Sequence, residues 1–328
     1  MSEPILQVKN LHVHYITDDE TVMAVNGVSF ALKQGESLGL VGETGAGKTT
    51  TALSVMQLIP DPPGVIVDGD ILFEGKNLIY NTPKENQAIR GNGISMIFQD
   101  PMTALNPILT VGEQLVEVLV THKKLHRGEA KRQAVEFLEL VGVGRERFND
   151  YPHQFSGGQK QRVVIAMALL CSPKILIADE PTTALDVTIQ AQVLDIISNL
   201  QQQFQMAMLL ITHDLGVVAE TCDRVAIMYA GQIVEAGTVE DVYLSPMHPY
   251  TRALFDSIPR ITEDEKPLIP IEGEVSNPAN LPSGCFFHPR CRYCQEICRT
   301  TEPGIQGGEH WSKCHFATLR EGDAPCQS

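Results

Sequence analysis

Apolar residues along the chain alternate between short continuous runs and stretches with helical spacing. The runs at 37–42, 174–178 and 207–212 have the length and apolar content of buried strands. Helices are predicted at 48–59 and 188–203, the second with Ile189, Val193, Ile196 and Leu200 on one face. Strands that alternate with helices form a mostly parallel sheet covered on both faces, so the predicted fold class is α/β.

The pattern changes in three other regions. Residues 5–100 are predicted to contain short strands separated by glycine turns. Between residues 100 and 160, Ala134, Phe137, Leu138 and Val141 recur at helical spacing and predict an all-helical insertion. Prolines replace periodic apolar positions over 259–284, which indicates an extended connector before a cysteine-bearing segment. The expected organisation is therefore one domain over 1–245 and an extension over 246–328.

Charge and the lengths of the apolar segments argue against a nucleic-acid-binding protein and against a secreted or membrane-spanning one. The 328 residues carry a formal net charge of −15 and are 43% hydrophobic, which is typical of a soluble globular protein and lacks the basic surface that nucleic acids require. Residues 1–10 show no secretory signal, and the apolar stretch 163–178 is interrupted by Ser172-Pro173 and is too short to span a bilayer. A role at a membrane would need a partner that spans it.

A glycine-rich loop follows the first apolar run and precedes the first predicted helix. It reads Gly42, Glu43, Thr44, Gly45, Ala46, Gly47, Lys48 and Thr49, with Thr50 next, and fits the phosphate-binding pattern G-x-x-x-x-G-K-[ST]. Its glycines allow backbone N–H groups to point at phosphates, Lys48 supplies a cation, and the Thr49 hydroxyl can bind Mg²⁺. The flanking strand and helix argue against a chance glycine turn.

Two acidic residues end the apolar run at 175–178. Asp179 and Glu180 would stand at the carboxyl end of a buried strand, where a second contact to magnesium is needed. We expect Asp179 to hold the magnesium hydration shell and Glu180 to act as general base on, or to orient, the attacking water. The pattern is weak alone and strong downstream of a phosphate loop.

A third motif identifies a family. Ser156, Gly157, Gly158 and Gln159 precede Lys160-Gln161-Arg162 and an apolar helix. This segment resembles the signature of ABC-type ATPases, and the resemblance extends over about the first 245 residues. It implies a P-loop NTPase (RecA-like) core with an inserted helical subdomain at about 100–160.

The resemblance also implies roles for single residues. Tyr15 would stack on adenine, Gln99 would contact Mg²⁺ and the water and sense the membrane partner, Asp186 would lie where two subunits communicate (in Ala184-Leu185-Asp186), and His213 would contact the γ-phosphate. Without the resemblance, Tyr15 and His213 read as packing residues and Gln99 as a cap. In this family two identical or homologous subunits face head to tail. Each ATP then lies between the phosphate loop of one subunit and the signature segment of the other.

Two features of the C-terminal region resemble a subfamily. The stretch His-Pro-Tyr-Thr-Arg-Ala-Leu-Phe at 248–255 resembles that of ABC ATPases from oligopeptide, dipeptide and nickel importers. The spacing of Cys285, Cys291, Cys298 and Cys314 resembles their iron–sulfur site. Four thiolates suit a [4Fe–4S] cluster or tetrahedral Zn²⁺, and Cys294 is a competing ligand. A metal staple for a segment too poor in apolar residues to fold alone is expected, with a redox sensor as the alternative. The ATP site is expected to lie in a separate domain and to take no ligand from the cysteines.

The predicted function is hydrolysis of ATP to power import of di- or oligopeptides from the cytoplasmic face of a membrane. The partners implied are two transmembrane permeases, a second ABC ATPase and an extracytoplasmic binding protein, with no nucleic acid. Three alternatives remain: import of nickel or another small solute, a soluble ABC ATPase of DNA repair or translation, and an iron–sulfur scaffold with a decayed nucleotide site. Intact Lys48, Glu180 and His213 disfavour the last.

Overall fold

The centre of the molecule is an eight-stranded sheet. The computed structural model describes residues 3–100, 104–183, 185–257 and 270–317. The sheet runs in the order β11 (Gln306–Gly307), β12 (Trp311–Ser312), β10 (Gln232–Thr238), β9 (Arg224–Tyr229), β3 (Ser37–Val41), β8 (Ala207–Thr212), β7 (Ile175–Asp179) and β6 (Ile94–Ile97). The strands from β9 to β6 are parallel, as the alternation of strands and helices predicts.

Alternate residues of the central strands enter two different apolar cores. On β7, Ile175 and Ile177 belong to the core shared with the N-terminal strands, whereas Leu176 and Ala178 belong to the core shared with the long helices. Every residue of β3, β7 and β8 is buried. A strand covered on both faces needs a continuous apolar run, which is why these strands could be predicted with nearly correct ends.

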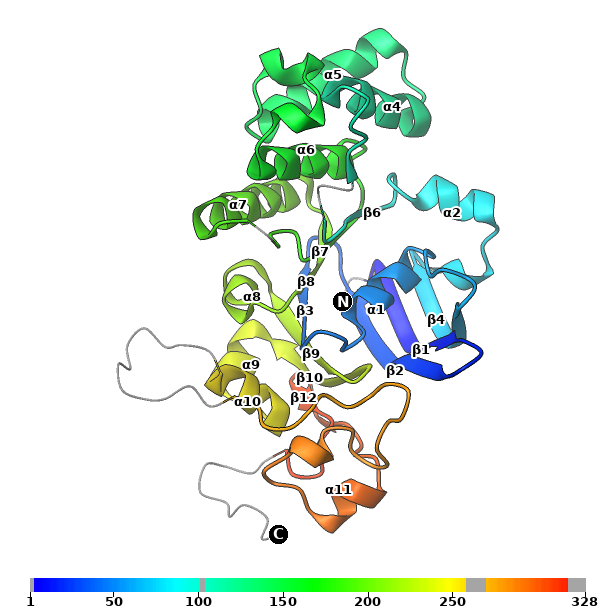
Figure 1. The fold of residues 1–328 in the computed structure, drawn as a ribbon, viewed down its shortest axis with the longest axis vertical. Coiled ribbons are helices and arrows are strands. Elements are labelled where there is room, and N and C mark those ends of the chain that lie inside the picture. Colours follow the sequence, from blue (N-terminus) through cyan, green and yellow to red (C-terminus); the bar gives the residue numbers. More distant parts are fainter. Residues whose placement is uncertain (1–2, 101–103, 184, 258–269, 318–328) are drawn as a thin grey trace.

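The N-terminal strands differ from the prediction of short strands. β1 (Leu6–Ile16) and β2 (Thr21–Leu32) are 11 and 12 residues long, and they form an antiparallel sheet with β4 (Gly64–Phe73) and β5 (Lys76–Asn77) beside the central sheet (Figure 1). Gly69 has φ 102° inside β4, and a Cβ there would come within 2.5 Å of the Asn10 carbonyl oxygen. The pairing of β1 with β4 shifts at this point, so this glycine serves a bulge rather than a turn.

The helices lie between and around the strands. They are α1 (Lys48–Val55), α2 (Pro83–Ile89), α4 (Val111–Lys123), α5 (Arg127–Leu140), α6 (Gly157–Leu169), α7 (Val187–Phe204), α8 (Leu215–Thr221), α9 (Val239–Leu244), α10 (Pro249–Asp256) and α11 (Glu296–Thr300). The helix predicted at 188–203 is confirmed as α7. The one predicted at 48–59 ends at Val55, because Gln57 adopts φ 52°.

Residues 104–160 contain no strand among those described, and α4, α5 and α6 gather at one end of the molecule (Figure 1). Thr110 and Glu113 form a reciprocal capping box at the start of α4. Ala134 and Leu138 are fully buried on α5, and Phe137 packs against the same core. The helical spacing therefore marks the buried face of α5.

The C-terminal extension completes the central sheet. β12 pairs with β10 through Glu235 and Ala236, and a third apolar core joins Tyr250 and Phe287 of the extension to Val41 and Tyr229 of the sheet. In Figure 1 this orange and red part lies at the end opposite α4 and α5. None of the helices in the described ranges is long and apolar enough to cross a membrane.

Candidate functional site

A cavity of about 440 Å³ opens where the parallel strands end. β3, β7 and β8 run side by side, so the segments that follow them meet at one edge of the sheet. The cavity is lined by Tyr15, Val22, Ala24, Thr44, Gly45, Ala46, Gly47, Lys48, Thr49, Thr50, Gln99, Glu180, His213 and Pro278. The structure therefore brings together most of the residues predicted from the phosphate-loop, acidic-strand and histidine patterns.

The glycine-rich loop connects β3 to α1 in a path that larger residues cannot follow. Gly47 has φ 96°, and a Cβ at this position would overlap the Ala24 carbonyl oxygen. A Cβ at Gly42 would overlap the Met228 carbonyl oxygen. Gly45 also has a positive φ of 82°, but it has open space around it on the cavity side. Gly42 and Gly47 are needed because their neighbours leave no room for a Cβ, and Gly45 is needed for the turn.

Lys48 is held across the loop that precedes it. Its ammonium group donates hydrogen bonds to the carbonyl oxygens of Gly42 at 2.6 Å and Glu43 at 3.0 Å. Burial lowers the pKa of Lys48, while the charges of Glu180, Asp179 and Glu43 act in the opposite direction. Lys48 also lines the cavity, so its ammonium group is placed to bind an anionic ligand that enters there.

Asp179 and Thr49 fit a magnesium ion. Asp179 is 2% exposed, and its Oδ1 atom has no hydrogen-bond partner among the described residues. Burial raises the pKa of Asp179, and the hydrogen bond with Thr49 and the charge of Lys48 oppose that rise. An unpartnered buried carboxylate oxygen beside a hydroxyl is the donor set that Mg²⁺ accepts.

Glu180 is the centre of a polar cluster. Its carboxylate accepts hydrogen bonds from Gln99 Nε2 at 2.9 Å and Thr183 Oγ1 at 3.0 Å and lies 3.2 Å from His213 Nδ1. Partial burial raises the pKa of Glu180, but the hydrogen bonds from His213 and Thr183 outweigh it, so the net pKa lies below the usual value. The carboxylate is therefore ionised at neutral pH. The backbone of Glu180 has a φ of 46°, which marks the turn that directs its side chain into the cavity.

The signature residues lie outside this cavity. Ser156 caps α6 and forms a capping box with Gln159, and its exposed side chain is not among the described residues that line the cavity. Gly157 is also exposed and Gly158 is half-buried, and a Cβ at Gly158 would come within 2.5 Å of Ile189. Asp186 is exposed and caps α7. Ala184, which belongs to the same predicted segment, lies outside the described residues. The chain thus carries two separate sets of predicted binding residues.

Comparison with known proteins decides the family. Residues 25–183 match the family model described as ABC transporter, and residues 234–298 match the one described as oligopeptide/dipeptide transporter, C-terminal region. The chain is 52% identical over 303 residues to the oligopeptide transport ATP-binding protein AppD of Bacillus subtilis, covering 92% of each chain. The chain belongs to the ATP-binding subunits of oligopeptide and dipeptide ABC transporters. It is thus an ABC ATPase, whose ATP hydrolysis is coupled to transport.

Two further comparisons extend this assignment. The dipeptide transport ATP-binding protein DppD of Bacillus subtilis is 50% identical over 322 residues, 97% of this chain and 96% of its own. The solved dimer of the ATP-binding cassette MJ0796 in its post-hydrolysis state, bound to ADP and Pi, superposes with a TM-score of 0.64 at 26% identity, covering 71% of this chain and 98% of that one. The α/β P-loop fold is therefore that of an ABC ATPase.

The motifs did not indicate Thr183 and Pro278, which support or line the site of this ABC ATPase. Thr183 supports Glu180 from three positions downstream. Of the residues that were indicated, Tyr15 places its Oη 3.5 Å from Thr50 Oγ1. Pro278 lines the cavity although it belongs to the C-terminal extension. The extension thus contributes a residue to the wall of the cavity, while the expectation that the ATP site takes no ligand from the cysteines stays a prediction.

The cysteines of the extension converge without forming a metal site. Cys285, Cys291, Cys298 and Cys314 line one small cavity with His288 and His315. Burial raises the pKa of the Cys285 and Cys291 thiols, to about 11 and about 12. Across the described ranges, no three His, Cys, Asp or Glu side chains are placed to hold a metal ion. The side chains as placed do not fit a [4Fe–4S] cluster or Zn²⁺.

Proposed function

We propose that this ABC ATPase powers the import of di- and oligopeptides from the cytoplasmic face of a membrane. The observation that carries the proposal is the Glu180 carboxylate, which lines the same cavity as Lys48 and the glycine-rich loop. The family assignment supports the peptide class, because AppD and DppD, each matched over more than 90% of this chain, are oligopeptide and dipeptide transport proteins by name.

ATP binding would use the loop and the first strand. The amides of 44–47, the N-terminus of α1 and the Lys48 ammonium would hold the phosphates. Tyr15, which also lines the cavity, would stack on adenine, with Thr50 beside its hydroxyl. Thr49, Asp179 and Gln99 would hold Mg²⁺, which neutralises phosphate charge when bound.

Hydrolysis would use the cluster around Glu180. A water between Glu180 and the γ-phosphate would form a bond to phosphorus as the bond to the β-phosphate oxygen breaks, and its proton would pass to Glu180. Gln99 would orient this water, and His213, whose side chain is 68% exposed, would contact the γ-phosphate. Thr183 keeps the carboxylate in place through its hydroxyl.

The position of the signature residues supports a head-to-tail dimer. Ser156, Gly157 and Gly158 do not line the cavity of their own chain. Because the first amides of a helix have no partner within the helix, those of Gly157 and Gly158 at the start of α6 are suited to an anion. In the proposed dimer they would contact the γ-phosphate bound by the other chain, and Asp186 would lie near the contact. The second chain would be an identical or a homologous ABC ATPase.

Ser156→Arg tests this arrangement in a mixed dimer. When the only intact phosphate loop belongs to the other chain, we expect turnover to fall by roughly tenfold or more, because the arginine would occupy the space of the γ-phosphate. Thr110→Arg is the matched control, since Thr110 caps α4 with the same type of capping box. Loss confined to the phosphate loop of the substituted chain would contradict the dimer.

The remaining partners are assigned by region. We infer that the helical insertion at about 100–160 contacts two transmembrane permeases, because Gln99 precedes it and donates a hydrogen bond to Glu180, and Ile108 is 79% exposed. An extracytoplasmic binding protein would deliver the peptide. The boundary between a nucleotide-binding domain and the extension is proposed near residue 245.

Peptide uptake by cells tests the cargo. A strain that lacks this chain should lose most uptake of a labelled tripeptide, and the wild-type gene should restore it whereas a Glu180→Gln gene should not, because transport requires hydrolysis. Uptake of a free labelled amino acid is the control and should not change. Normal tripeptide uptake combined with lost uptake of ⁶³Ni²⁺ would overturn the peptide assignment.

The cysteine segment is proposed as a structural staple. Phe287 is 1% exposed and lies between the cysteine cavity and the third apolar core, so the segment is anchored by apolar burial. The iron–sulfur and zinc expectations rest on the sequence spacing alone. No step of the reaction is assigned to a metal in this segment.

A further inference from the structure

We propose that Arg290, in the C-terminal extension, is a positioning residue for the phosphate loop. The inference rests on the proposed role of residues 42–49 in holding ATP and adds a residue to that site. The starting observation is a long-range ion pair. Arg290 stands next to Cys291 in sequence, but its side chain contacts Glu43, the second residue of the glycine-rich loop.

The ion pair is bidentate, and the side chain of its arginine is buried while that of Glu43 is half-buried. Arg290 Nη1 donates to Glu43 Oε2 at 2.7 Å and Nη2 donates to Oε1 at 3.1 Å. The Arg290 side chain is 3% exposed, and its guanidinium carbon lies 5.8 Å from the centre of the Tyr229 ring. Two parallel hydrogen bonds fix the orientation of a carboxylate as well as its position, which a single contact does not.

Arg290 is itself fixed by the extension. Its Nε donates to the Glu272 carbonyl oxygen at 3.2 Å, and Nη2 also donates to the Ile271 carbonyl oxygen at 3.3 Å. These carbonyls precede the segment that reaches the cavity at Pro278. The guanidinium therefore links the connector, the cysteine segment and the loop, and it is not free to follow Glu43 if the loop moves.

The main chain of Glu43 is held from the same side. Its N–H donates to Tyr250 Oη at 3.0 Å, and Tyr250 is fully buried with its ring 4.7 Å from that of Tyr229. The carbonyl of Glu43 accepts the hydrogen bond from Lys48. The extension thus fixes the side chain and the amide of Glu43, and Lys48 fixes its carbonyl.

A second contact joins the extension to the wall of the cavity. Met23 N–H donates to the Pro278 carbonyl oxygen at 2.9 Å, and Pro278 lines the cavity beside Val22. The extension therefore supports both the loop and the strand opposite it. A loop fixed before ATP arrives loses less conformational entropy when its amides meet the phosphates, so this support should appear as affinity for ATP.

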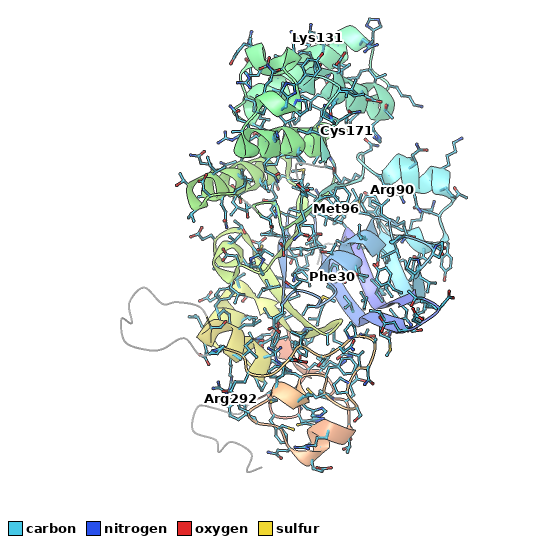
Figure 2. The ribbon with its side chains drawn as sticks, viewed as in Figure 1. Phe30, Arg90, Met96, Lys131, Cys171 and Arg292 are labelled. Carbon is cyan, nitrogen blue, oxygen red and sulfur yellow. The ribbon has the colours of Figure 1, made fainter. Side chains whose placement is uncertain are left out.

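Substitution of Arg290 separates positioning from mere folding. In Arg290→Met, we expect the Kd of a fluorescent ATP analogue and the KM for ATP to rise roughly five- to twentyfold, with kcat within about twofold of wild type. Arg290→Lys keeps one charge but loses the bidentate geometry, and should show a smaller rise in both constants. The matched control is Arg292→Met, since Arg292 is exposed two positions away (Figure 2).

A double-mutant cycle assigns the effect to Glu43. Glu43→Gln should weaken binding to a similar extent, and Glu43→Gln/Arg290→Met should be no weaker than Arg290→Met alone, because both changes remove one interaction. Additive losses would overturn the proposal. So would an Arg290→Met protein with a lower melting temperature but unchanged Kd and KM, since that pattern describes a structural role only.

Two outcomes keep this inference distinct from the proposed function. If wild-type protein fails to bind the analogue, or Lys48→Ala binds it normally, the assignment of the loop is wrong. If Lys48→Ala loses binding and Arg290→Met does not, only the role of Arg290 is wrong. Should Arg290→Met fail to fold, Arg290→Lys decides, and a Kd equal to that of wild type would refute the positioning role.

Discussion

Glu180→Gln should reduce ATP hydrolysis by roughly 10²–10⁴-fold and leave ATP affinity close to that of wild type. The two side chains have the same shape, so the contacts with Gln99, Thr183 and His213 can largely be kept. What is lost is an ionised oxygen that can take the proton of the attacking water. Because the variant binds ATP without splitting it, it should accumulate as an ATP-bound dimer.

The measurement is single-turnover phosphate release together with the size of the protein in the presence of ATP and Mg²⁺. Glu146→Gln is the control, since Glu146 is an exposed glutamate in the helical region and lies outside the cavity lining. A Glu180→Gln protein that releases phosphate at the wild-type rate would remove Glu180 from the mechanism. A slow variant that remains monomeric with ATP would leave the base assignment intact and contradict the ATP-bound dimer.

The chemistry of the cavity was predictable because parallel strands bring their ends together. Lys48 follows the run that became β3, Glu180 follows β7 and His213 follows β8, and these three strands are neighbours in the sheet. Buried strands have continuous apolar runs, so each run also predicted the position of the polar residue that follows the strand. The helix α7 was equally clear, because one of its faces is buried and the other is exposed.

Contacts between distant segments could not be predicted in this way. Arg290 and Glu43 are 247 positions apart, and neither belongs to a periodic pattern that indicates the other. Pro278 lies in a proline-rich stretch whose composition indicates an extended chain but not the surface it crosses. The bulge at Gly69 could not be predicted because a glycine within a bulge and a glycine at a turn look alike in sequence.

Lys48→Ala should act on binding, where Glu180→Gln acts on the chemical step. The ammonium group is buried and bonds to two loop carbonyls, so its removal takes away a phosphate contact and also releases the loop. A charge-assisted hydrogen bond contributes about 1.5–3 kcal/mol, which corresponds to a fall in ATP affinity of roughly 10- to 100-fold. The Asp179 and Glu180 carboxylates would then face the phosphates without the nearest cation, which adds to the loss.

Equilibrium titration with a fluorescent ATP analogue checks this expectation, with Lys84→Ala as the control because Lys84 is an exposed lysine on α2. Unchanged affinity in Lys48→Ala would refute the phosphate role of the lysine. The comparison with Arg290→Met is informative, because that variant keeps Lys48 and loses only the support of Glu43. If both roles are correct, Lys48→Ala must weaken binding more than Arg290→Met does, since the lysine contacts the phosphates and also holds the Glu43 carbonyl that lies between it and the extension.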